Sequence, residues 1–213
     1  MARKRRFMKK FLWSSLGMIV LSGLITAYVF YSRIYQPNVV FEFEKEVYVY
    51  IPSGAAFEDV QSILTEKGVV RNTSSFRWVA EQKSYTTRIK SGRYLLTNGM
   101  NNNELVNLLR SGRQTPVNVV FNNVRTKEQL SAKVATQLEL DSLDLLFAMT
   151  DTAFLNPLGL NAFTISALFV PNTYEFYWDV SVADFLARME AEHHHFWTES
   201  RKTKAQKLNL TPE

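Results

Sequence analysis

Residues 11–31, from Phe11 to Tyr31, read FLWSSLGMIVLSGLITAYVFY and decide on which side of a membrane the rest of the chain is expected to lie. These 21 residues carry no charged side chain, and at about 1.5 Å of rise per residue a helix of this length spans the roughly 30 Å hydrocarbon core of a bilayer. Six basic residues precede the run: Arg3, Lys4, Arg5, Arg6, Lys9 and Lys10. Because basic flanks stay in the cytoplasm, we expect a cytoplasmic tail at residues 1–10, a transmembrane anchor at residues 11–32, and everything after it outside.

The alternative to a retained anchor is a cleaved signal peptide. Signal peptides have apolar cores of about 7–15 residues that end at a small-x-small cleavage site. The core here is longer, and it leads into residues 27–31, AYVFY, whose aromatic side chains suit the membrane–water interface. The sequence therefore favours an anchor that remains attached.

The net charge of +5 does not indicate a nucleic-acid-binding protein. The first ten residues hold six of the 25 Lys and Arg and none of the 20 Asp and Glu, so the chain without them has a net charge of −1. No basic stripe interleaved with aromatic residues is present, and we expect no nucleic-acid partner. The chain has no cysteine, which excludes disulfides and thiol chemistry.

A pattern of strand, polar turn and helix occurs three times after a tether at residues 33–46. The predicted strands are 47–51, 92–96 and 117–121, the turns 52–54, 97–99 and 122–123, and the helices 58–67, 104–110 and 127–138. Acidic residues lie in the first turn of each helix, where the helix dipole favours them. Alternating strands and helices predict an α+β fold with small sheets covered by helices.

The remaining segments predict further helices and a fourth strand. Residues 72–80 read as a short helix capped by Ser74 or Ser75, and residues 142–149 as another. Residues 156–161 read as a Pro/Gly loop, residues 167–178 as an apolar strand interrupted by a Pro-Asn-Thr turn, and residues 181–208 as one long helix. The chain finishes with Thr211, Pro212 and Glu213, which is typical of a helix start, so we expect a fragment that ends as its next helix begins.

The three histidines do not predict a metal site. His193, His194 and His195 are consecutive, and consecutive helical residues point about 100° apart, so they cannot converge on one ion as residues four apart can. A solvated helix face is the favoured interpretation. Without another histidine or any cysteine, neither a catalytic triad nor a zinc site is predicted.

Glu175 is the sharpest local candidate for chemistry. It lies among Tyr174, Phe176, Tyr177 and Trp178, and a carboxyl group in apolar surroundings acquires the raised pKa of a general acid. On a strand, however, Glu175 shares a face with Tyr177 while the other aromatic residues take the opposite face. The favoured interpretation is that the aromatic face is core and that Glu175 points to solvent.

The asparagine runs at residues 101–103 and 122–123 have two interpretations. Their amides could hydrogen-bond the hydroxyl groups of a sugar. Turn and N-cap positions are favoured, because asparagine tolerates the left-handed conformation and caps helices well.

Three blocks of the sequence resemble the YceG-like endolytic murein transglycosylases. They are residues 51–70 (IPSGAAFEDVQSILTEKGVV), residues 91–112 (SGRYLLTNGMNNNELVNLLRSG) and residues 168–176 (LFVPNTYEF). The first two resemble the family's glycan-binding LysM-like subdomain, and the third resembles the opening of its catalytic domain. The resemblance implies a LysM-like strand–helix subdomain at residues 47–113 and the N-terminal part of a truncated mixed α/β transglycosylase domain at residues 114–213.

The resemblance also implies which site residues this chain holds. The family's catalytic glutamate lies in a helix downstream of the third block, so we expect it beyond Glu213 and expect no catalytic residue in this chain. The substrate-binding candidates are Asn172, Tyr174, Glu175 and Tyr177, with no metal and no cofactor. Two departures affect this region: Ser166-Ala167 stands where the family has Glu-Gly, and Asn172 stands where it has Asp.

The function implied by the resemblance is cleavage of peptidoglycan. We expect a single-pass protein of the inner membrane, with its bulk in the periplasm, that cuts the β-1,4 bond between N-acetylmuramic acid and N-acetylglucosamine in nascent glycan strands. Its expected partners are those strands, the membrane and cell-wall synthases. The alternative is a non-catalytic peptidoglycan-binding scaffold of the cell-wall machinery.

The topology is testable with a reporter fused after Glu213. We expect the reporter to be active only outside the cytoplasm, because the basic tail holds the N-terminus inside. We also expect the fusion to stay in the membrane pellet after alkaline washing. Release of a shortened soluble form would mean that residues 11–31 are a signal peptide.

Overall fold

The computed structural model describes residues 2–42, 44–121 and 124–210, with side chains at Trp13 and from Ser15 onward. Contacts divide the chain into two compact units. Unit 1 comprises Met1–Val49, Ala55–Lys90 and Tyr94–Arg113, and unit 2 comprises Tyr50–Gly54, Ser91–Arg93 and Gln114–Glu213. The fold is a mixture of helices and small sheets, as the alternation of segments predicted.

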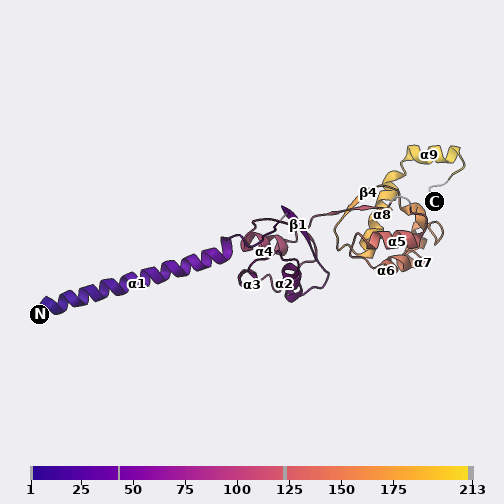
Figure 1. Cartoon of the computed structure of the whole chain (residues 1–213). Coiled ribbons are helices and arrows are strands. Elements are labelled where there is room, and N and C mark those ends of the chain that lie inside the picture. The colour runs from indigo at the N-terminus through magenta and orange to yellow at the C-terminus, as the bar shows by residue number, and fades with distance from the viewer. Residues whose placement is uncertain (1, 43, 122–123, 211–213) are drawn as a thin grey trace. The chain divides into compact units, whose positions relative to one another are not determined.

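The first element is the long helix α1 (Ala2–Tyr35), drawn in indigo in Figure 1. Its segment Ser15–Tyr35 is near the N-terminus and is long and apolar enough to cross a membrane. The helix ends just before Pro37, which has no backbone N–H to donate. The residues that follow α1 pack against the rest of unit 1, since Val39 forms a β-bridge with Val70 and is fully buried.

Unit 1 contains three helices after α1 and most of a two-stranded sheet; the end of the first strand and the start of the second belong to unit 2. The strands are β1 (Glu46–Ile51) and β2 (Gly92–Thr97), and the helices are α2 (Phe57–Glu66), α3 (Thr73–Gln82) and α4 (Asn102–Ser111). Phe57 stacks on Phe76 with ring centroids 5.8 Å apart and meets Tyr85 edge-on at 6.1 Å. These rings join α2 to α3 and to the loop that follows it.

Capping residues explain where these helices begin and end. Asn101 and Glu104 form a reciprocal capping box at the start of α4, with N–O distances of 2.9 and 3.0 Å. Gly112 ends α4 in the left-handed conformation with φ of 71°, which glycine adopts without strain. The cap predicted for α3 was wrong: Asn72, not Ser74 or Ser75, accepts the hydrogen bond from the Ser75 N–H. Asn72 occupies this position because it is extended and precedes the first helical residue.

Unit 2 is built on a second two-stranded sheet. Strands β3 (Val117–Val120) and β4 (Thr173–Phe176) are antiparallel, with Asn118 opposite Glu175 and Val117 opposite Phe176. The helices are α5 (Lys127–Ala135), α6 (Ser142–Ala148), α7 (Thr152–Leu155), α8 (Val182–Phe196) and α9 (Glu199–Lys207), with 3-10 turns η1 (Asn156–Leu158) and η2 (Ile165–Leu168).

The core of unit 2 is rich in aromatic side chains. Phe176 of β4 packs against Phe185 of α8 with centroids 5.0 Å apart, and Phe121 stacks on Tyr174 at 5.3 Å. Phe169 contacts both Phe121 and Phe185, at 6.0 and 6.3 Å. This cluster joins the sheet to α8.

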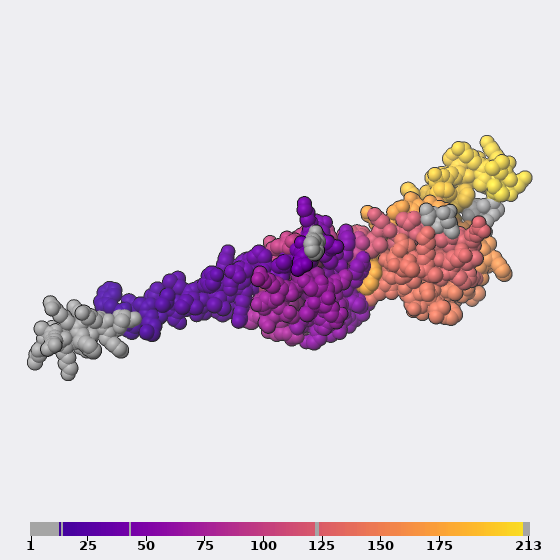
Figure 2. All heavy atoms as spheres, viewed as in Figure 1, coloured from indigo at the N-terminus to yellow at the C-terminus, as the bar shows by residue number. Residues whose placement is uncertain are grey.

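Two predictions for unit 2 were wrong. Residues 167–178 do not form an interrupted strand, because Ala167 and Leu168 belong to the 3-10 turn η2 and only Thr173–Phe176 pairs with β3. Residues 181–208 are two helices rather than one, because Thr198 is extended and its side chain accepts from the Arg201 N–H at the start of α9. Figures 1 and 2 show α9, in yellow, standing off the rest of unit 2, and Ala205 is its one buried residue.

The helix start predicted at residues 211–213 and the turn predicted at Asn122-Asn123 lie outside the described residues.

Truncation of Phe185 to alanine tests the aromatic cluster. Phe185 is fully buried, and replacing such a side chain with alanine costs about 3–5 kcal/mol through lost burial and a cavity. We expect Phe185→Ala to accelerate hydrogen exchange in β3, β4 and α8, measured by mass spectrometry. The matched control is Phe163→Ala, because Phe163 is 94% exposed and its truncation should leave exchange unchanged.

Candidate functional site

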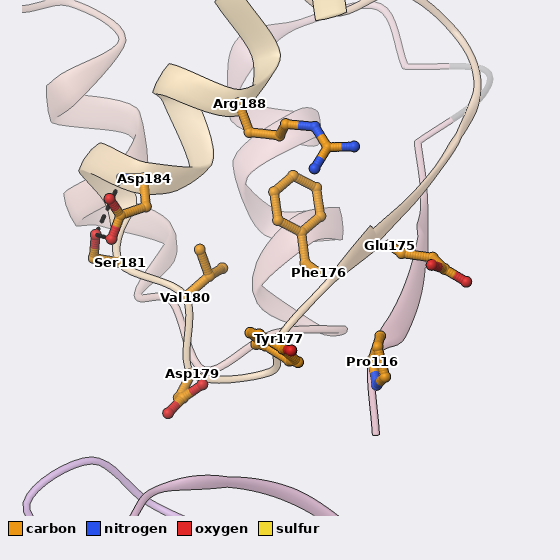
Figure 3. Close-up of a pocket in the computed structure, with 9 residues that line it drawn as sticks. All are labelled: Pro116, Glu175, Phe176, Tyr177, Asp179, Val180, Ser181, Asp184 and Arg188. Carbon is orange, nitrogen blue, oxygen red and sulfur yellow. Dashed lines mark hydrogen bonds between the residues drawn. The ribbon is translucent and has the colours of Figure 1, made fainter. Parts of the chain in front are cut away.

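An open cavity in unit 2 lies where β4 turns into α8. It has a volume of about 660 Å³ and is lined by residues from the end of β4, the following turn and the first two turns of α8 (Figure 3). The lining residues are Pro116, Glu175, Phe176, Tyr177, Asp179, Val180, Ser181, Asp184 and Arg188. Its size is within the range of small-ligand sites.

The alternation of β4, continued by the next residue, Tyr177, decides which side chains reach the surface. Tyr174 and Phe176 are buried, whereas Glu175 and Tyr177 are exposed, as the period of a strand predicted. Tyr177 is 57% exposed and presents its ring beside the cavity. In Figure 3 the Glu175 carboxylate turns away from Phe176 and from Arg188. Glu175 is therefore on the rim rather than in an apolar pocket.

The other two candidate residues do not line the cavity. Tyr174 is 4% exposed, and its hydroxyl donates a hydrogen bond of 2.6 Å to the Val170 carbonyl oxygen. Burial first, and then the nearby Glu192 carboxylate, raise the pKa of Tyr174, so this phenol stays protonated and serves as a structural donor. The Asn172 side chain accepts from the Thr173 N–H at 2.8 Å and orders the start of β4.

The beginning of α8 forms one wall of the cavity. Ser181 caps the helix: its hydroxyl oxygen accepts from the Asp184 N–H at 3.1 Å and donates to the Asp184 carboxylate at 2.6 Å (Figure 3). The signal that could have identified this wall is the Ser-x-x-Asp spacing, which is a helix-start signature. Sequence reasoning placed a helix start there without connecting it to a site.

Asp179 is held by two hydrogen bonds within unit 2. Its carboxylate oxygens accept from the Gln114 side-chain amide at 2.9 Å and from the Ser91 hydroxyl. Gln114 lies so close to Gly92 that a Cβ there would fall 2.0 Å from the Gln114 amide carbon. A larger residue at position 92 would displace the Gln114 side chain, and the φ of 126° at Gly92 is a conformation that glycine favours. No local pattern in the sequence joins these residues.

Arg188 supplies the positive charge of the cavity. Its Nε is 2.7 Å from a carboxylate oxygen of Glu192, one helical turn along α8. Arg188 and Phe176 both line the cavity (Figure 3). Three carboxylates and one guanidinium surround an exposed tyrosine ring in this cavity. The carboxylates can accept hydrogen bonds from the hydroxyl groups of an uncharged ligand, and the guanidinium can donate hydrogen bonds to them.

The described residues offer no enclosed acid. Among them, no Asp or Glu is buried, so none has the apolar surroundings that convert a carboxyl group into a general acid at neutral pH. No group of three or more His, Cys, Asp or Glu in the described part of the chain is placed to hold a metal ion. His194 lies 3.7 Å from Glu190 on the surface of α8.

Comparison with known proteins identifies relatives of this chain. A family model described as the YceG-like family matches residues 49–213. A solved structure of a yceG-like protein from Listeria monocytogenes is similar, with 22% sequence identity and a TM-score of 0.43. The match covers 79% of this chain and 60% of that protein, so the chain spans less than two thirds of its length. No curated protein matches.

Proposed function

We propose, because this chain belongs to the YceG-like family, that it forms part of a membrane-anchored transglycosylase that cleaves peptidoglycan glycan strands from within. The observation that carries the proposal is the family match over residues 49–213, which includes every residue that lines the cavity. The three sequence blocks at residues 51–70, 91–112 and 168–176 support the same assignment.

The proposed ligand of the cavity is a segment of the glycan. The exposed Tyr177 ring offers a flat apolar surface to a sugar face, and Glu175, Asp179 and Asp184 offer carboxylate oxygens to its hydroxyl groups. Residues 47–113, proposed as a LysM-like module, would hold another part of the strand. Of the four residues first chosen from the sequence, Glu175 and Tyr177 keep a proposed contact with substrate, and Asn172 and Tyr174 are proposed to position β4.

The proposed location is the inner membrane. The apolar segment Ser15–Tyr35 of α1 would span the bilayer once. The basic tail would remain in the cytoplasm, and the chain after α1 would face the periplasm, where the glycan is. Cell-wall synthases, which produce nascent strands at the same membrane, are the proposed partners.

The proposed reaction needs one carboxylic acid. The acid gives its proton to the glycosidic oxygen as that oxygen leaves C1 of N-acetylmuramic acid, and the resulting carboxylate takes the proton of the C6 hydroxyl as its oxygen bonds to C1. The product carries a 1,6-anhydro ring, and no water is consumed. The family resemblance implies an acid beyond Glu213, and we assign the role to none of the described carboxyl groups, which are not buried.

Glycan binding can be tested by co-sedimentation of the detergent-solubilised chain with purified peptidoglycan sacculi. We expect Tyr177→Ala to weaken binding about fivefold, because an aromatic contact is worth about 1 kcal/mol. Phe147→Ala is the matched control, since Phe147 is 67% exposed on α6 and does not line the cavity. Equal losses in the two variants would contradict the site, and binding that collapses in modest salt would indicate surface charge instead.

Activity can be tested by mass spectrometry of glycan digests. We expect residues 1–213 alone to release no fragments with anhydromuramic ends, and a longer form that includes the downstream glutamate to release them. In the longer form, changing that glutamate to glutamine should abolish cleavage, since loss of a general acid costs about 10²–10⁴-fold in rate.

The control in the same longer form is Glu175→Gln, which we expect to reduce the rate only modestly because Glu175 is an exposed rim residue. If residues 1–213 alone cleaved glycan and Glu175→Gln eliminated that cleavage, two assignments would be wrong: the acid beyond Glu213 and the non-catalytic role of Glu175.

A further inference from the structure

A polar pocket lies in unit 1 where α1 meets α3 and α4, the three elements that come together at the right-hand end of the indigo helix in Figure 1. Its volume is about 400 Å³. The lining residues come from the end of α1, the segment after it and the starts of α3 and α4: Ser32, Arg33, Gln36, Pro37, Asn38, Arg71, Asn72, Ser75 and Asn102. Nothing in the proposed glycan chemistry uses this pocket.

The floor of the pocket is a network of paired amides. Asn102 is 1% exposed, and its amide nitrogen donates to the Arg33 carbonyl oxygen at 2.8 Å and to the Ser75 hydroxyl at 2.9 Å. Asn38 is 4% exposed and donates to Asn102 at 2.6 Å and to the Asn72 carbonyl oxygen at 3.0 Å. Because these buried groups satisfy one another, the floor is rigid and α1 is held against α3 and α4.

The rim of the pocket carries uncompensated positive charge. Arg33 and Arg71 both line it, and no Asp or Glu is among the lining residues. Within the described part of the chain, neither guanidinium forms an ion pair. Arg33 is positioned by Trp78, whose ring centroid is 5.9 Å from its guanidinium carbon, and Trp78 in turn packs on Phe30 at 5.4 Å. Two arginines with free donors are suited to a phosphate group.

The position of the pocket along α1 indicates the source of that phosphate. The apolar segment begins at Ser15, and at 1.5 Å per residue Arg33 lies about 27 Å further along the helix, close to the roughly 30 Å thickness of the hydrocarbon core. Tyr28, Tyr31 and Tyr35 are exposed on the same stretch of helix and are typical of the interface. The rim is therefore at the depth of the lipid headgroups.

We propose that Arg33 and Arg71 bind the headgroup phosphate of an anionic phospholipid on the outer side of the membrane. The bound lipid would hold the rest of unit 1 on the membrane surface in one orientation, because the amide floor fixes α1 against α3 and α4. This inference rests on the proposal that α1 spans the membrane.

The test uses the full chain in mixed micelles of phosphatidylcholine and phosphatidylglycerol, with retained lipid measured by native mass spectrometry. We expect the wild type to retain phosphatidylglycerol in preference to phosphatidylcholine. Each basic residue near an anionic lipid contributes about fivefold in affinity, so the Arg33→Gln, Arg71→Gln double variant should lose up to roughly 30-fold of this preference. The six basic residues of the tail are the same in every variant and set a common background.

The matched control is the Arg88→Gln, Arg110→Gln double variant, which removes the same charge from exposed arginines of unit 1 that do not line the pocket. The preference should survive in this control. Equal loss in both double variants would assign the effect to general surface charge and overturn the site. Displacement of the lipid by millimolar inorganic phosphate would overturn the lipid assignment in favour of a soluble anion.

Recovery of the protein outside the membrane fraction would overturn the spanning role of α1. In contrast, a membrane-bound protein without lipid preference would overturn only this inference and leave the proposed function standing. Arg33→Gln removes a basic residue from the outer side of the helix and so does not weaken the expected topology.

Discussion

The pairing of β3 with β4 is the constraint on which unit 2 depends. With Asn118 opposite Glu175, Phe176 points inward to Phe185, and Tyr177 points outward to the cavity. A shift of one residue would exchange the two faces, bury a carboxylate and expose the aromatic residues that join the sheet to α8. The large cost of burying an unpaired charge therefore sets the register, and the register sets the side chains that a ligand can reach.

Unit 1 depends in a similar way on the end of α1. The last four carbonyl groups of any helix lack partners within it, and Asn102 supplies a donor to one of them, at Arg33. An asparagine from α4 thus extends the hydrogen bonding of a helix that starts far earlier in the chain. The Asn102 contact therefore fixes the end of α1 against the rest of unit 1.

The two cavities differ in chemistry because carboxylates predominate in the lining of one and arginines in the lining of the other. Around the cavity of unit 2, the carboxylates of Asp179 and Asp184 accept hydrogen bonds from neighbours, and Arg188 pairs with Glu192. The lining is therefore acidic, and its carboxylates offer acceptors to the hydroxyl groups of the proposed glycan. At the end of α1 the arginines have no acidic partner among the lining residues, which suits an anion. The difference arises from a few residues at helix ends and not from the folds of the units.

The sequence by itself determined the elements whose signals are local. The uncharged run of α1, the strand–helix alternation and the capping box at Asn101 follow from neighbouring residues, and so does the outward face of Glu175 and Tyr177. Tertiary structure alone decided the partner of Asn102 and the assembly of the cavity around Asp179. These features depend on contacts between residues far apart in the chain, and the periodicity of a single segment carries no information about which distant side chain will satisfy a buried polar group or close a cavity.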